Sequence, residues 1–114
     1  MNTAKQMNLF SSLPVTLLGS GPITKKFWEF HKANPGVYLE LKKLALDLKK
    51  KGHRHYGIKG LFEVLRWHRA METQGSEFKL NNNYTALYAR LLMHYEHSLE
   101  GFFAIRNSSE QVIE

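Results

Sequence analysis

Apolar residues recur at helical intervals in several stretches of the chain, most regularly between residues 35 and 51. One side of this stretch carries the stripe Val37, Leu41, Leu44 and Leu48, widened by Tyr38 and Ala45. Lysines occupy the other side and the end, where positive charge suits the helix dipole, and Gly52 suits the position after the last turn. The pattern predicts a helix that begins at Pro35, with Asn34 as its cap, and ends near Lys51.

The stretches on either side have the same periodicity. A helix capped by Thr24 and ending near Ala33 is expected to place Phe27, Phe30 and His31 on one side. Another helix over residues 57–71 is expected to turn four residues toward the core: Ile58, Leu61, Phe62 and Leu65. Its apolar side is widened by Val64, Trp67 and Met71.

A further helix follows three consecutive asparagines, one of which is expected to cap it. Its predicted buried face consists of Tyr84, Leu87, Tyr88, Leu91, Leu92 and Tyr95. Ser98 is expected to cap a short last helix with the apolar residues Leu99, Phe102, Phe103 and Ile105. These elements predict a single compact all-α domain of four to five helices.

The chain divides into three parts by composition. Residues 1–22 form an N-terminal arm that is apolar and ends in a turn sequence, so we expect it to pack in part onto the domain or onto a second subunit. The helical domain covers residues 23–106, and residues 107–114 form a polar C-terminal tail.

The net charge of the chain says more about its possible function than its content of apolar residues does. Sixteen Lys and Arg against ten Asp and Glu give a net charge of +6, which favours a polyanionic partner or, equally, a lysine-rich face in water. The absence of cysteine excludes thiolate chemistry, and no apolar run is long enough to span a membrane. Residues 7–18 lack the features of a signal peptide, so we expect a cytoplasmic protein of a bacterial cell.

The positive charge is concentrated between residues 42 and 69, where nine Lys or Arg accompany only two acids. A cluster that spans two helices and their connection is able to follow a phosphate backbone. The residues predicted to contact phosphates are Lys49, Lys50, Lys51, Arg54, Lys59, Arg66 and Arg69. The alternative is an outer face that is simply solvated.

Asn81, Asn82 and Asn83 stand where a helix begins and its N–H groups are exposed. Asparagine binds adenine in a bidentate manner, so in a helix-turn-helix-like arrangement this turn would read bases, with Thr85 and Arg90 near the groove. However, the preceding connection is longer than the usual turn, and asparagine is also an ordinary cap. One short helix pair contacts few base pairs, so a homodimer is plausible.

The histidines and acids give no catalytic pattern. His94 and His97 are one helical turn apart and His53 and His55 are two residues apart, but structural or solvent-facing roles explain them better than a metal. Glu63, Glu72 and His68 have the chemistry for acid–base work but are indistinguishable from ordinary helix surface. We therefore predict a protein that is not an enzyme and has no cofactor and no metal.

Three motifs resemble a group of small, uncharacterised bacterial and prophage-borne proteins. They are Phe27-Trp28-Glu29-Phe30-His31 with Asn34-Pro35, the run 57–67 (GIKGLFEVLRW), and the run 78–91 (FKLNNNYTALYARL). The resemblance covers residues 27–106 and implies a mobile-element setting without a mechanism. Two hypotheses follow: a non-catalytic DNA-binding protein acting as a phage or prophage regulator, or a phage-encoded inhibitor or adaptor that binds an acidic protein, such as a host defence protein.

Overall fold

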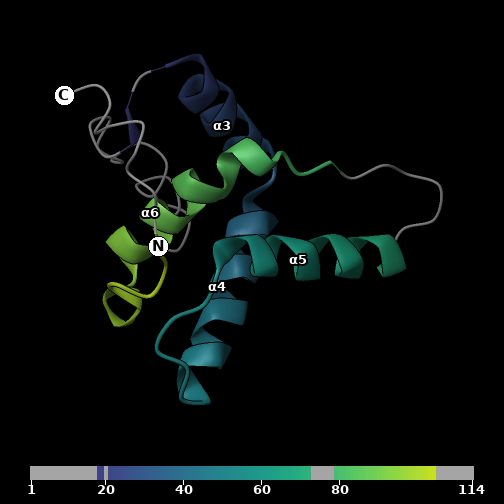
Figure 1. Ribbon diagram of the computed structural model, residues 1–114. Coiled ribbons are helices and arrows are strands. Elements are labelled where there is room, and N and C mark those ends of the chain that lie inside the picture. The colour runs from purple at the N-terminus through teal and green to yellow at the C-terminus, as the bar shows by residue number, and fades with distance from the viewer. Residues whose placement is uncertain (1–17, 20, 73–78, 105–114) are drawn as a thin grey trace, which may run out of the picture.

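The computed structural model describes residues 18–19, 21–72 and 79–104, which fold into helices and turns with no strand among them. The elements in chain order are α3 (Pro22–Ala33), α4 (Pro35–Lys50), α5 (Ile58–Glu72), the 3-10 turn η1 (Asn82–Tyr84), α6 (Thr85–Tyr95) and the 3-10 turn η2 (His97–Leu99). The predicted class, a single all-α domain, is confirmed (Figure 1).

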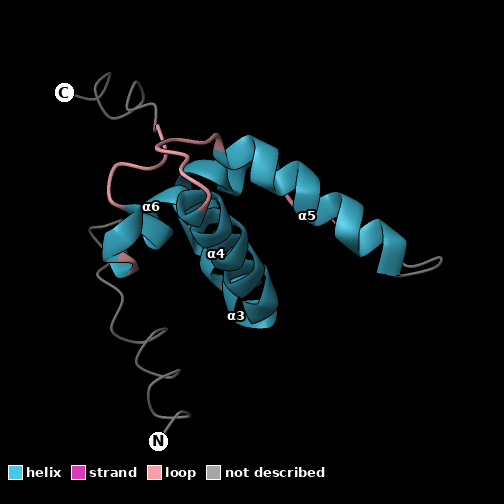
Figure 2. Ribbon diagram, turned by 90° about the horizontal axis from the view of Figure 1, so that it is seen from below, coloured by secondary structure: helices cyan, strands magenta, loops and turns pink. Residues whose placement is uncertain are grey.

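Helix α4 is the centre of the arrangement, because it contacts α3, α5, α6 and η2. Helix α5 begins beside α4 and then runs outward, so that its C-terminal half extends beyond the other helices in both ribbon views (Figures 1 and 2). The chain returns from there to the start of α6, which packs against α5 and α4. The N-terminal half of α5 therefore has neighbours that the other half lacks.

The core is built from the faces that the periodicity predicted. In α5 the buried residues are Ile58, Leu61, Phe62 and Leu65, as expected. Trp67 and Met71 do not widen this face, because their side chains are 61% and 67% exposed. The prediction that they join the core was wrong.

His31 lies in the core among aromatic rings. Its ring stacks on Phe27 with the two centroids 5.7 Å apart, and it meets the rings of Tyr38 and Tyr88 edge to face. Burial lowers the pKa of His31 from 6.5 to about 4, so the imidazole is neutral at pH 7. The histidine is thus a core residue, as the helical spacing of the first helix indicated.

Helix ends differ from the sequence prediction at two places. Helix α3 begins at Pro22 and not after a Thr24 cap, since Thr24 is buried inside the helix and its hydroxyl donates to the Leu18 carbonyl (3.1 Å). Asn34 makes no side-chain cap bond to α4; its amide donates to the Phe30 carbonyl (3.0 Å) and closes the end of α3 instead.

The predicted last helix is also shorter than expected. In the described residues the 3-10 turn η2 forms in its place, with Glu96 and not Ser98 at the cap position. Gly101 follows with a φ of +75°, a left-handed conformation that ends the helical path. Phe102 and Phe103 still pack into the core, but from a turn. Leu18 is buried near the end of the N-terminal arm, and Pro22, the last residue of the arm, already belongs to α3. Residues 1–17 and 20 of the arm and the whole C-terminal tail lie outside the described residues.

Candidate nucleic-acid interface

Five cations follow the connection from α4 to α5. We call them the basic cluster: Lys49, Lys50, Lys51, Arg54 and Lys59. Lys49 and Lys50 end α4, Lys51 follows as its C-cap residue, Arg54 lies in the connection and Lys59 stands in the first turn of α5. All five are exposed.

A tight turn fixes the beginning of this connection. Gly52 has a φ of +103°, which favours glycine. The N–H of Gly52 donates to the Lys49 carbonyl (3.0 Å) and that of His53 to the Leu48 carbonyl (3.1 Å), the pattern of a Schellman motif. The motif satisfies carbonyls at the end of α4 and holds the lysines on an ordered helix end.

The basic cluster contains no acidic side chain of its own. No Asp or Glu occurs between residues 48 and 62. The acid next to it in the sequence, Asp47, accepts a hydrogen bond from Lys43 (2.9 Å), and this bond, with the charges of Lys50 and Lys51, lowers the pKa of the Asp47 carboxyl. Within the described parts of the chain, no cluster side chain makes an ion pair, so all five charges face solvent.

Arg66, which the sequence analysis predicted to belong to the same binding surface, makes hydrogen bonds within the protein instead. Its guanidinium donates from Nη1 to Glu63 Oε2 (2.8 Å) and from Nη2 to the Leu80 carbonyl (2.7 Å) and to Asn82 Oδ1. It therefore fastens the segment before η1 to the middle of α5. We call Arg66, Leu80 and Asn82 the Arg66 junction.

The three asparagines have distinct roles. Asn81 Oδ1 accepts the N–H of Asn83 (2.8 Å) and so caps the 3-10 turn η1. The prediction that an asparagine caps α6 itself was wrong, because the residue at that position is Tyr84 and no side chain makes a cap bond there. Asn82 binds Arg66, and its carbonyl accepts the hydroxyl of Thr85 (3.0 Å). All three asparagines are exposed. Of the three, only the side chain of Asn83 makes no hydrogen bond to another described residue.

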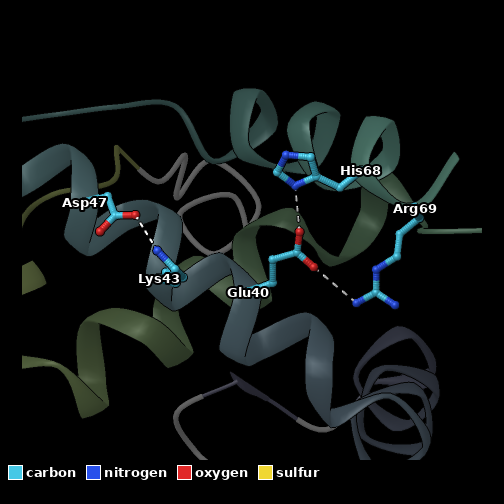
Figure 3. A network of polar contacts seen from close by, with 5 residues as sticks. All are labelled: Glu40, Lys43, Asp47, His68 and Arg69. Atoms are coloured by element: carbon cyan, nitrogen blue, oxygen red, sulfur yellow. Dashed lines mark hydrogen bonds and ion pairs between the residues drawn. The ribbon is translucent and has the colours of Figure 1, made fainter. Parts of the chain in front are cut away.

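Arg69 is also engaged within the protein. The carboxylate of Glu40 on α4 lies between two side chains of α5, with Oε2 2.9 Å from His68 Nδ1 and Oε1 3.4 Å from Arg69 Nη2 (Figure 3). These pairs tie the outer half of α5 to α4. His68 thus meets Glu40, and not the Glu63 or Glu72 that the sequence suggested.

The structure thus separates the predicted site residues into two regions. In Figure 1 the end of α4 lies below α5, whereas the start of α6 lies above it. Lys49, Lys50 and Lys51 belong to the end of α4, and the three asparagines and Thr85 belong to η1, its preceding residue and the start of α6, while Lys59 and Arg66 come from the first turn and the middle of α5. Arg90 lies further along α6, half-buried.

Other features predicted from the sequence have these positions. His53, His55, His94 and His97 are all exposed, and the described residues contain no group of three His, Cys, Asp or Glu side chains arranged to hold a metal ion. No helix in the described part is long and apolar enough to cross a bilayer. Residues 73–81 connect α5 to η1, a longer link than a helix-turn-helix turn of about three to four residues.

Comparison of the chain with protein families, curated proteins and solved structures finds no match. The resemblance to prophage-borne proteins therefore stays a prediction.

Proposed function

We propose that this protein binds nucleic acid without catalysis and that the basic cluster contacts the phosphates. The observation that carries this proposal is the group of five exposed cations that make no direct ion pair with the described residues, although the charge of Asp47 interacts with Lys50 and Lys51. Lysines at a helix end are also favourable against the dipole, but that effect needs only the last turn. Arg54 and Lys59 lie beyond it and have no such structural reason.

The expected mode of contact is with the backbone of duplex DNA. Lys and Arg bind phosphates without reading sequence, and they release counterions when they do so. Base reading has less support, because Asn81 and Asn82 already make hydrogen bonds within the protein. Base contact by Asn83, and a role as a phage or prophage regulator, stay predictions.

The test is a titration of labelled duplex DNA by fluorescence anisotropy at several salt concentrations. The slope of log affinity against log salt changes by about 0.9 for each phosphate contact. Replacing Lys51, Arg54 and Lys59 by alanine should therefore reduce the slope by about 2 to 3 and weaken binding at least about tenfold.

The matched control replaces three exposed lysines of α3, Lys25, Lys26 and Lys32, by alanine and removes the same charge. Its DNA affinity should change far less. Equal losses in the two variants, or an affinity that does not depend on salt, would contradict the proposal.

A further inference from the structure

A groove with an apolar floor runs along the lysine-bearing side of α4. Its volume is about 530 Å³, and its lining consists of Leu39, Lys42, Lys43, Leu46, Asp47, Lys49, Lys50 and, from η2, Ser98. Leu39 is 54% exposed, although it lies in a helix that packs on four other elements. An exposed leucine inside a groove differs from one scattered on a convex surface, because a ligand covers it more completely.

The rim of this groove is positive. Four lysines line it, against Asp47 as the single acid. Lys42 and Lys43 are paired with Glu96 (3.0 Å) and Asp47 (2.9 Å), while Lys49 and Lys50 have no ion-pair partner among the described residues. The complementary ligand has carboxylates on either side of an apolar group. A nucleic-acid backbone supplies the charge but leaves Leu39 uncovered.

The spacing of the lining residues indicates a helical ligand. Leu39 and Leu46 are seven residues apart, which is two turns or about 10.5 Å along α4. The lysines come in two pairs, 42–43 and 49–50, each three to four residues after a leucine. A second helix with leucines one heptad apart and glutamates between them matches both repeats.

We propose that this groove is a docking site for an acidic amphipathic helix of a partner protein. The site does not depend on nucleic-acid binding, because Leu39, Lys42, Lys43 and Leu46 lie outside the basic cluster. Lys49 and Lys50 belong to both surfaces, so the helix and DNA compete for them. Such a partner would regulate DNA binding by displacement.

The probe is a labelled three-heptad peptide with leucine at every seventh position, glutamates at the two positions that face each lysine pair, and alanine elsewhere. A scrambled peptide of the same composition is the control, and binding is measured by anisotropy on the full chain. The patterned peptide should bind at least about tenfold more tightly than the scrambled one, since only it covers Leu39 and Leu46 together.

Two variants locate the site. Leu39→Gln removes an exposed apolar side chain without changing charge, and it should weaken peptide binding about tenfold while leaving DNA affinity unchanged. The double variant Lys49→Glu with Lys50→Glu should weaken the binding of both the patterned peptide and DNA. The control Lys25→Glu with Lys26→Glu on α3 should leave the preference for the patterned peptide over the scrambled one intact.

Equal binding of the two peptides, or an unchanged affinity in Leu39→Gln, would overturn the proposal and leave only diffuse charge attraction. Vesicles of phosphatidylglycerol provide a second comparison: binding to them that requires Leu39, without binding to the peptide, would replace the helix by a membrane surface. Because the peptide assay contains no DNA, it succeeds or fails separately from the proposed function.

Discussion

The basic cluster and the Arg66 junction both present cationic side chains, which are exposed in the cluster and hydrogen-bonded within the protein at the junction. Arg66 reaches a carboxylate, a carbonyl and an amide oxygen within its own chain. The cluster cations reach none among the described residues, since no acid occurs between residues 48 and 62. A Lys or Arg side chain found in the sequence is therefore a candidate for phosphate binding only where the fold supplies no hydrogen-bond acceptor for it within the protein.

Acid should produce the largest change, and it acts on the core that supports both regions. The unfolded chain protonates His31 below pH 6.5, whereas the folded chain resists protonation until about pH 4. Stability should therefore fall as the pH decreases from 6.5 to 4, by roughly 3 kcal/mol in total for a shift of this size. Urea unfolding at about pH 7.5 and about pH 5 measures the first part of this loss, roughly 2 kcal/mol, because each pH unit below 6.5 removes about 1.4 kcal/mol until the folded-state pKa is approached.

His31→Phe is the matched variant, because it keeps an aromatic ring in place and cannot be protonated. Its stability should fall less than that of the parent protein over the same range. If the two proteins lose equal stability, His31 is not the responsible group. Comparisons of the two regions are cleanest above pH 6.5 for this reason.

Arg66→Ala should separate stability from binding. It leaves the Leu80 carbonyl and Asn82 without their donor, and hydrogen bonds to charged groups contribute about 1.5–3 kcal/mol, so we expect a loss of roughly 2 kcal/mol in urea unfolding. DNA affinity, measured on the folded variant, should change less than in the variant that lacks Lys51, Arg54 and Lys59. A large loss of affinity with unchanged stability would place Arg66 on the binding surface after all.

The smallest effect distinguishes two neighbouring asparagines. Asn82→Ala removes an acceptor of Arg66 and should destabilise the protein by about 1 kcal/mol. Asn83→Ala removes an exposed amide with no side-chain hydrogen bond to the described residues, and its stability should change by less than about 0.5 kcal/mol. Thermal unfolding of the pair is sufficient; equal shifts would mean that the Arg66 junction adds nothing at Asn82.

Patterns in the sequence correctly predicted those features that depend only on residues close together in the chain. The buried face of α5 follows from 3.6-residue spacing, and the free basic cluster follows from a run without acids. Spacing alone cannot show how far around a helix the core extends, so it assigned Trp67 to the core although its side chain is exposed. Contacts between distant parts of the chain, such as Arg66 with Asn82 or His68 with Glu40, require the tertiary arrangement.

The groove residues show the same limit. Leu39 and Leu46 lie off the stripe that predicts the core side of α4, so the helical spacing indicates no site there, although Leu46 packs in part against the core. A signal was present, since two leucines one heptad apart stand among lysines on the polar side. It becomes a groove only when η2 supplies the opposite wall, and the sequence predicted a longer helix there.

The exposure of Trp67 has a spectroscopic consequence. The chain has two tryptophans, and Trp28 is half-buried against the core whereas Trp67 stands on the outer half of α5. An indole in water is open to collisional quenchers such as acrylamide, and one packed among aromatic rings is shielded. Intrinsic fluorescence should therefore resolve into two populations, and the quenchable one reports on the outer half of α5 without any added label.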